Sequence, residues 1–220
     1  MREVTRRNLK RVARRLFAER GVDGVSVREI VEAAGQRNAA ALHYHFGTKD
    51  DLVRELLLDG ARLIDDSRQA ILDAQEAAGG PTSVRDVMVA LVTPNLTMRG
   101  EAGEEETYLR FIVALQAHHR ELFRELLEER WGQGYQRCLT HLRRLLARLP
   151  AELVNQRLVF MGMAMQAWLA AREAAVDHAG PGKHRFWDAG STTDSMIDSL
   201  TGLLEAEPTA ALAAQFPHRG

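Results

Sequence analysis

Cysteine, long apolar runs and strand-forming patterns are scarce or missing in this chain of 220 residues. A single cysteine, Cys138, cannot form a disulfide within the chain, which fits a reducing cytoplasm. No run of 18 or more apolar residues is present, so no membrane span is expected. The arginine-rich start lacks the apolar stretch of a secretory signal. Alternating β-branched runs and Asn-Gly hairpin turns are missing as well, which argues against a β-rich fold.

The motifs of common enzymes and metal sites are also missing. The chain has no Gly-x-Ser-x-Gly, no His-Glu-x-x-His and no glycine-rich phosphate loop with its Lys-Ser/Thr. His43 and His45 lie two residues apart, which places them on different faces of a helix. The remaining candidates, His118-His119 and His141, have no cysteine-rich or His-x-x-x-His partner set. We therefore expect neither an enzyme nor a bound metal or cofactor.

Charge is present in quantity but unevenly spread. Residues 1–50 carry 11 Arg and Lys against 6 Asp and Glu, whereas the remaining residues carry 18 against 24. The overall net charge of −1 hides this asymmetry. A basic amino-terminal part on an acidic remainder is typical of a chain whose first part binds a polyanion, although a solvated basic helix face would give the same count.

Helical periodicity runs through nearly the whole chain. Leu9, Val12, Ala13, Leu16 and Phe17 form the apolar stripe of a first amphipathic helix. Ser26 with Glu29 is a capping box that opens a second helix, and Thr48 caps a long fourth one. Later helices are expected at 83–98, 104–117, 119–148, 151–178 and 191–206. The sequence thus predicts an all-α fold of about nine helices.

The short helices near the amino terminus have the outline of a helix-turn-helix. The second helix ends at Gly35, and an alanine-rich helix with little bulk on its front follows it. The alanine-rich helix is therefore the candidate reading head, in a three-helix unit over residues 1–47 that precedes a helical body over residues 48–206. Residues 207–220 follow as a tail that we expect to be disordered.

The helix predicted at 151–178 is apolar nearly all round, as its segment "LVFMGMAMQAWLAA" illustrates. Such a helix must be covered on more than one side. One cover is the core of its own subunit, and the other is a second subunit, with the helix at 191–206 alongside. We therefore expect a homodimer; a helix buried entirely within a monomer is the alternative.

Several spaced motifs over residues 5–58 resemble the DNA-binding domain of TetR-family transcriptional regulators. The matching segments are Leu16-Phe17-Ala18-Glu19-Arg20-Gly21, Ser26-Val27-Arg28-Glu29-Ile30, Ala34-Gly35 and Phe46-Gly47-Thr48-Lys49. The resemblance implies an all-helical homodimer in which a three-helix reading head is joined by the fourth helix to a ligand-binding body. It also implies that a small molecule in the body releases the protein from its DNA.

One departure from the family concerns the turn before the third helix. Eleven residues separate Gly35 from Phe46, one more than is usual in the family. Alignment backward from Phe46 keeps Leu42 in the family's buried position. The family's base-facing positions then fall on Ala39, Ala40 and His43, and its phosphate-contacting positions fall on Tyr44 and Lys49.

Side-chain chemistry extends this list to further residues of the head. Arg37 and Asn38 precede the alanines and have the groups that recognise guanine and adenine, whereas small apolar side chains suit a thymine methyl. Either residue could instead cap the helix or contact a phosphate. Arg28 is a further candidate for phosphate neutralisation. The expected DNA-binding residues are Arg28, Arg37, Asn38, Ala39, Ala40, His43, Tyr44 and Lys49.

The body should hold a pocket lined by apolar and aromatic side chains with a few polar anchors. The candidate lining residues are Phe111, Leu115, His118, Trp131, Tyr135, Met161, Met165 and Trp168. Each of them is equally compatible with plain core. Gly132 and Gly134 beside Trp131 indicate a bend, and the methionines adapt to varied apolar shapes. We expect a largely apolar effector.

These patterns favour a cytoplasmic, ligand-responsive dimeric regulator that binds a near-palindromic double-stranded operator. A repressor is the expected form, and an activator on the same scaffold has the same sequence pattern. The competing hypothesis is a helical small-molecule-binding or enzymatic protein whose basic head is incidental. The basic head on an acidic body favours the regulator.

Overall fold

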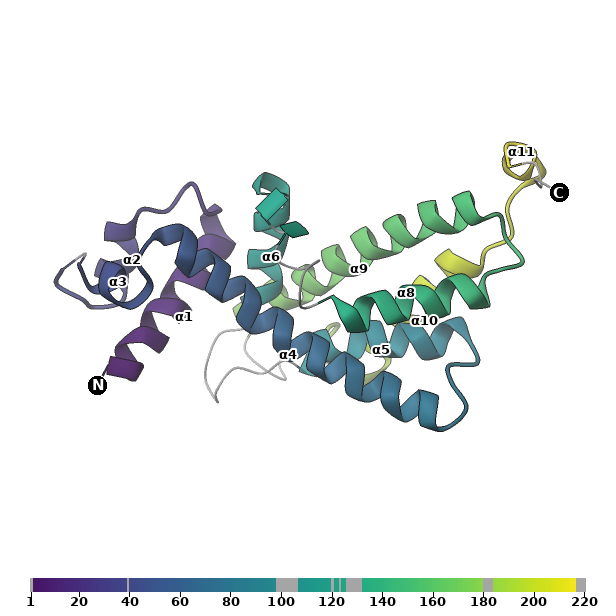
Figure 1. Cartoon of the computed structure of the whole chain (residues 1–220), viewed down its shortest axis with the longest axis horizontal. Coiled ribbons are helices and arrows are strands. Elements are labelled where there is room, and N and C mark those ends of the chain that lie inside the picture. Colours follow the sequence, from purple (N-terminus) through teal and green to yellow (C-terminus); the bar gives the residue numbers. More distant parts are fainter. Residues whose placement is uncertain are drawn as a thin grey trace.

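A computed structural model describes the protein at residues 2–38, 40–97, 107–119, 121–122, 124–125, 132–179 and 184–216. These residues form ten helices and no strand, so the predicted all-α class is confirmed. The molecule is elongated, with the amino terminus at one end and the last short helix at the other (Figure 1). The helices are α1 (Arg2–Arg20), α2 (Val27–Ala33), α3 (Ala40–Phe46), α4 (Lys49–Ala77), α5 (Val84–Thr97), α6 (Tyr108–His118), α8 (Gln133–Leu145), α9 (Ala151–Ala179), α10 (Gly190–Glu205) and α11 (Ala210–Ala213).

The head consists of α1, α2 and α3 packed on the first turns of α4. Its core includes Leu9 and Phe17 of α1, Ile30 of α2 and Leu42 of α3, all with no exposed surface. The apolar stripe predicted for α1 is the face that is buried here. Helices α2 and α3 have seven residues each, too short to be stable alone, so this shared core is what holds them.

Helix α4 is the longest connection in the molecule. It begins at Lys49, and its 29 residues run from the head to the far end of the body (Figure 1). Its start is fixed by the predicted cap Thr48, because Thr48 Oγ1 accepts from the N–H of Asp51 at 3.0 Å, and Asp51 completes a capping box. One continuous helix therefore connects the head to the body.

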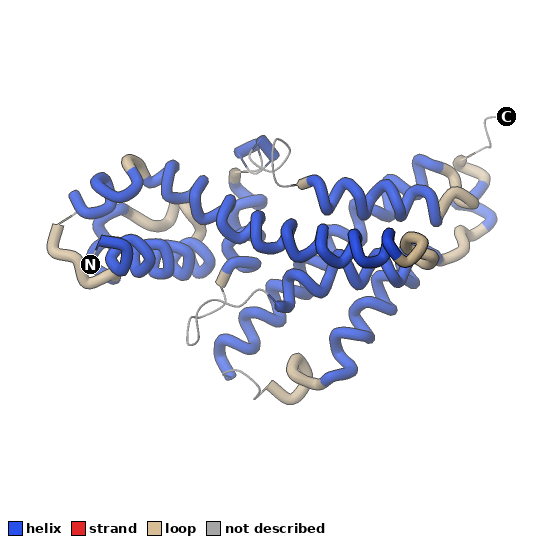
Figure 2. The backbone as a smooth tube through the Cα atoms, turned by 60° about the horizontal axis from the view of Figure 1, so that its bottom comes forward, coloured by secondary structure: helices blue, strands red, loops and turns tan. Residues whose placement is uncertain are grey.

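The body packs α5, α8, α9 and α10 around a second core, which α4 covers (Figure 2). Fully buried side chains from several of these helices meet there, including Met88, Leu142, Met161 and Leu200. The two cores are separate clusters of buried residues. The molecule is thus built as two packed units that share α4.

Helix α6 joins the two units and has contacts with both α1 and α9. On the head side, the rings of Phe111 and Phe17 stack with centroids 6.1 Å apart. Tyr108 donates its hydroxyl proton to the carbonyl of Leu57 in α4 at 2.8 Å. On the body side, the buried carboxylate of Glu173 in α9 accepts from the N–H of Leu109 and of Arg110, both at 2.9 Å.

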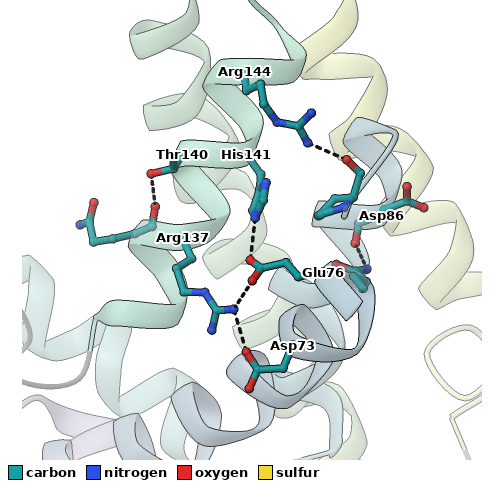
Figure 3. Close-up of polar contacts among 10 residues, drawn as sticks. Asp73, Glu76, Asp86, Arg137, Thr140, His141 and Arg144 are labelled. Carbon is teal, nitrogen blue, oxygen red and sulfur yellow. Dashed lines mark hydrogen bonds and ion pairs between the residues drawn. The ribbon is translucent and has the colours of Figure 1, made fainter. Parts of the chain in front are cut away.

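Polar contacts fasten α8 to the end of α4 (Figure 3). Arg137 donates to Asp73 at 2.7 Å and to Glu76 at 2.9 Å, and His141 bonds the other oxygen of Glu76 at 2.9 Å. Arg144 reaches the carbonyl of Pro81 in the following turn. Because these groups lie at the surface, they fix the direction of α8 more than they stabilise the fold.

Two expectations about helix boundaries need revision. Within the helix predicted over 119–148, residues 121–122 and 124–125 are helical, and α8 covers Gln133 to Leu145 with Gly132 as its N-cap, so Gly132 marks a helix start. The tail expected to be disordered contains a short helix, α11, capped by Thr209. It raises the number of described helices to ten.

Candidate nucleic-acid interface and body core

Helix α2 is held in place by its own first turn. Ser26 Oγ accepts from the N–H of Glu29 at 3.2 Å, and the Glu29 carboxylate accepts from the N–H of Ser26 at 2.8 Å. Arg20 donates to the same carboxylate at 2.7 Å. The hydrogen bonds from Ser26, and then that from Arg20, lower the pKa of Glu29 to about 2. The predicted capping box is therefore present and joins the end of α1 to the start of α2.

The long turn before α3 is organised around Asn38. Gly35 takes the left-handed conformation at the end of α2, with φ of 68°. Asn38 Oδ1 then accepts from the N–H of Ala40 at 2.9 Å and caps α3. This is one of the three roles anticipated for Asn38. A bidentate contact with adenine would use that oxygen too, so the cap competes with this contact, whereas the amide N–H donors stay available to a base or phosphate.

Helix α3 has one buried and one exposed face. Leu42 and Phe46 are buried in the head core, and the expected burial of Leu42 is confirmed. Ala40, His43 and Tyr44 are exposed on the opposite face. Ala39 lies outside the described residues. The exposed face has the small front and polar end that close approach to a DNA groove requires.

Cationic side chains surround this face unevenly. Arg28 is exposed on α2 and forms an ion pair with Glu32 at 2.7 Å. Arg37 is exposed in the turn, at the rim of a cleft of about 300 Å³. The cleft is lined by Arg28, Val31, Glu32, Gln36, Arg37 and Asn38. Two arginines thus lie at the edge of a hollow next to the start of α3.

Lys49 is placed differently from the expectation for a phosphate contact. Its ammonium group donates to the carbonyl of Val25 at 2.7 Å and lies 6.0 Å from the ring centroid of Phe17. In this position it ties the start of α4 to the loop before α2. The phosphate role of Lys49 stays a prediction, and it requires the side chain to turn outward.

Two residues at the start of α1 extend the candidate surface and were missed by the sequence analysis. The guanidinium of Arg2 lies 4.8 Å from the centroid of the Tyr44 ring, and that of Arg6 lies 5.1 Å from the Phe46 ring. Arg6 also forms an ion pair with Glu55. The spacing of four between Arg2 and Arg6 puts both on one side of α1, a signal that the sequence contained.

The candidate effector residues do not form one group. Phe111 and Leu115 belong to the head core, whereas Tyr135, Met161, Met165 and Trp168 belong to or pack against the body core. The side chain of His118 and all of Trp131 lie outside the described residues. The described members of this set therefore do not line one shared pocket.

A buried polar cluster lies where α4 meets the start of α8, and the sequence analysis did not single it out. Asp65 accepts from the N–H of Gly134 at 3.0 Å and from the Gln69 amide at 2.9 Å. Arg68 is 6% exposed, and its nearest nitrogen is 3.7 Å from Asp65, beyond hydrogen-bond distance. Within the part of the chain that the structure describes, Arg68 Nε has no hydrogen-bond partner.

The neighbours of Arg68 are kept neutral by burial. Loss of solvent raises the pKa of Tyr135, and it raises the pKa of Cys138 to about 11. The Arg68 guanidinium lies 5.8 Å from the centroid of the Tyr135 ring. A charged donor with an unmatched N–H therefore lies inside the body, beside a phenol and a thiol.

An open groove of about 580 Å³ lies between Trp168 of α9, the segment 185–189 and α10. Of the candidate effector residues, only Trp168 lines it. The full lining is Trp168, Arg185, Phe186, Trp187, Ala189, Ser191, Thr192, Ser195, Met196 and Ser199. Among the described residues, no group of three His, Cys, Asp or Glu side chains is placed to hold a metal, and no helix has the length and hydropathy to cross a bilayer.

Comparisons with known proteins match both units of the chain. Residues 10–56 match the family described as bacterial regulatory proteins, tetR family, and residues 89–202, more than half of the chain, match the tetracyclin repressor-like C-terminal domain. The HTH-type transcriptional regulator AcrR of Shigella flexneri is 26% identical over 189 residues, 78% of this chain and 81% of AcrR. The HTH-type transcriptional repressor AcnR of Corynebacterium glutamicum is 40% identical over 62 residues, 28% of this chain and 32% of AcnR. The solved TetR-family transcriptional regulator PfmR of Thermus thermophilus has a TM-score of 0.47 at 20% identity, over 91% of this chain and 99% of PfmR.

Proposed function

Because this chain belongs to the TetR family and is thus a DNA-binding transcriptional regulator rather than an enzyme, we propose that it is a dimeric repressor and that a small molecule releases it from its operator. The observation that carries the proposal is the exposed face of α3, backed by the head core and flanked by arginines. The name of AcnR, a repressor that matches the head, favours repression over activation.

The exposed face of α3 enters the major groove in this proposal. Ala40 permits close approach, and His43 lies one turn further along the same face. Tyr44 offers a hydroxyl to the phosphate backbone, and Arg28 and Arg37 neutralise phosphates at the other edge. Arg2 joins this set because it packs on the Tyr44 ring.

The dimer is proposed to form through α9 and α10. Three large apolar side chains of α9 are left in solvent, namely Val159 (59% exposed), Phe160 (58%) and Met163 (64%). Ser199 and Gly202 of α10 are exposed and small, which favours close helix approach. Two heads then bind half-sites whose centres lie one helical turn or slightly more apart, on the order of 34–40 Å.

The effector is proposed to bind in the body beside Arg68. Tyr135 contributes apolar surface there and packs against the body core that includes Met161, which agrees with the largely apolar effector expected from the sequence. The unmatched Nε of Arg68 adds one requirement, because a buried donor gains most from a ligand that brings an acceptor. A carbonyl or carboxylate on an otherwise apolar molecule meets it.

Release of DNA follows from the contacts of α6 in this proposal. An effector that moves α8 or α9 also moves the two backbone bonds that Glu173 makes with α6. Helix α6 in turn packs on α1, so the angle of the head changes. The effector acts by binding better to the conformation in which the two heads no longer fit successive grooves.

The test of DNA binding is a gel shift on sequences selected from a random pool and on the protein's own promoter region. We expect a near-palindromic site, bound more weakly by an Ala40→Glu variant because the added carboxylate faces phosphate. Ala74→Glu is the matched control, since Ala74 is also an exposed helical alanine but lies at the body end of α4. Binding to no sequence would refute the proposal.

The test of the dimer is light scattering with size-exclusion chromatography. Phe160→Glu places a charge on the exposed apolar face of α9 and should yield monomers. Leu63→Glu makes the same change at a side chain of equal exposure, 58%, on α4 and should leave the dimer intact. Dimers of the Phe160 variant would place the interface elsewhere.

A further inference from the structure

His43 makes a hydrogen bond that fixes which of its ring nitrogens carries the proton. Its Nδ1 lies 2.6 Å from the carbonyl oxygen of Gly47. A carbonyl oxygen only accepts, so Nδ1 must be the donor, and in a neutral imidazole the other nitrogen, Nε2, then carries a lone pair and no hydrogen. The exposed histidine of α3 is thus an acceptor at Nε2.

The surrounding backbone holds this tautomer in place. The N–H of Gly47 donates to the carbonyl of His43 at 2.9 Å, so the two residues bond each other in both directions. Gly47 has φ of 82°, a conformation that side chains disfavour, and a Cβ there would lie 3.1 Å from Asp51 Oδ2. The carbonyl that orients His43 therefore has a fixed direction.

Bases differ in whether they offer a donor to such an acceptor. In the major groove, adenine presents its N6 amino group and cytosine its N4 amino group, whereas guanine presents acceptors at N7 and O6. We propose that His43 reads an adenine or a cytosine at one symmetric position of each half-site, by accepting a hydrogen bond from the amino group at Nε2. This proposal rests on the proposed function.

Neighbouring side chains of the exposed face do not offer the same chemistry. Asn38 has its oxygen engaged by Ala40, and Tyr44 has a hydroxyl that rotates between donor and acceptor roles. A simpler role for His43 is to close the end of α3 by satisfying the Gly47 carbonyl. Both roles use Nδ1, and they differ only in what Nε2 contacts.

The experiment begins with the operator selected by the natural chain. At each adenine of a half-site, purine, which lacks the amino group, replaces adenine, and at each cytosine 2-pyrimidinone replaces cytosine. Affinities are measured at about pH 8, above the range in which histidine ordinarily titrates. One symmetric position should show a loss of about fivefold on removal of the amino group, the scale of one neutral hydrogen bond.

The same substitutions are then repeated with two variants. His43→Ala should bind the natural and the modified operator equally at that position, whereas Tyr44→Phe, the neighbouring matched control, should keep the fivefold loss. Undiminished loss in the His43 variant, or no loss at any position for the natural chain, would overturn the proposal. Sensitivity to 7-deazaguanine that is present in the natural chain and lost in the His43→Ala variant would overturn it too, because that result requires a donor at Nε2.

A measurement on the unaltered protein guards against a variant that fails to fold. Nitrogen-15 NMR of the imidazole distinguishes the two neutral tautomers, and we expect the proton on Nδ1 of His43. A proton on Nε2 would overturn the proposal without any substitution. If the selection returns no preferred sequence, the proposed function fails, and the NMR result still decides whether His43 has the required geometry.

Discussion

Helices α2 and α4 at the head differ from helices α6 and α8 in how their first turns are capped. In the head, Ser26 and Glu29 cap α2, and Thr48 and Asp51 cap α4, from within the helix that each pair begins. In the body, neither α6 nor α8 has a capping side chain of its own. Their free N–H groups bond carboxylates from other helices: Glu173, 64 residues from Leu109, and Asp65, 69 residues from Gly134.

This difference separates helix starts that neighbours in the chain fix from helix starts that distant elements fix. The caps of α2 and α4 each depend on two residues three positions apart, although the head core also contains Phe111 and Leu115 of α6. The starts of α6 and α8 depend on α9 and α4 staying in place. A ligand that shifts those long helices acts directly on α6, the element that contacts α1.

The largest effect is expected from removing the remote cap of α6. Glu173→Ala leaves the partly buried N–H groups of Leu109 and Arg110 without this acceptor and removes one of the two carboxylates that pair with the Arg110 guanidinium, which should cost on the order of 3 kcal/mol of unfolding free energy. Urea unfolding at fixed protein concentration measures it. Glu152→Ala, an exposed glutamate of the same helix, is the control and should change stability by about 0.5 kcal/mol. Equal losses in the two variants would mean that α6 does not need the remote cap.

A somewhat smaller effect is expected from adding a methyl group at Gly60, where α4 contacts Tyr108 of α6. A Cβ at Gly60 would lie 2.2 Å from Cε2 of the Tyr108 ring, so Gly60→Ala must displace the ring and its hydrogen bond to Leu57. Overpacking of this kind costs about 1–3 kcal/mol. Gly190→Ala, where nothing lies within 4 Å, should be close to neutral in the same thermal-unfolding assay. An unchanged melting temperature in the Gly60 variant would show that the Tyr108 ring moves aside without loss of stability.

The same contrast explains how much of the structure the sequence predicted. The all-α class, the capping box of Ser26 and Glu29 and the cap Thr48 were predicted because each depends on residues close together in the chain. The buried place of Leu42 followed from the alignment with the family, and the cap of α3 by Asn38 was one of three open alternatives. Local patterns thus sufficed for most of the head.

The body was less predictable because its contacts join distant residues. Asp65 and Arg68 look like ordinary charges on the long fourth helix, and nothing local indicates their burial. Phe111 and Leu115 have the composition of pocket residues, yet they face the head core. Arg2 was missed for the same reason, since its contact with Tyr44 spans two helices.

A moderate loss is expected from removal of a local cap. Ser26→Ala should reduce unfolding free energy by about 1 kcal/mol, because one N–H of α2 loses its acceptor and Glu29 loses a donor. Ser83→Ala is a control of the same type in the body, since Ser83 Oγ accepts from Asp86 at the start of α5. Both losses should remain well below that of Glu173→Ala in urea unfolding. A larger loss at Ser26 would contradict the view that local caps are individually minor.

The smallest effect, and the sharpest contrast, is in the pH dependence of the two kinds of carboxylate. Hydrogen bonds from Ser26 and Arg20 lower the pKa of Glu29 to about 2, from a usual value of 4.5, so its contribution is complete above about pH 4.5 and is lost as the pH falls toward 2. Burial raises the pKa of Glu173, so its folded form takes up a proton first and gains relative stability as the pH falls from neutrality toward 4.5. The difference in urea midpoint between the natural chain and Glu29→Gln should therefore shrink on acidification. The urea midpoint of the natural chain relative to that of Glu173→Gln should instead rise as the pH falls from neutrality toward 4.5. Slopes of the same sign would mean that the donors around Glu173 outweigh its burial, and the remote cap would then behave electrostatically like the local one.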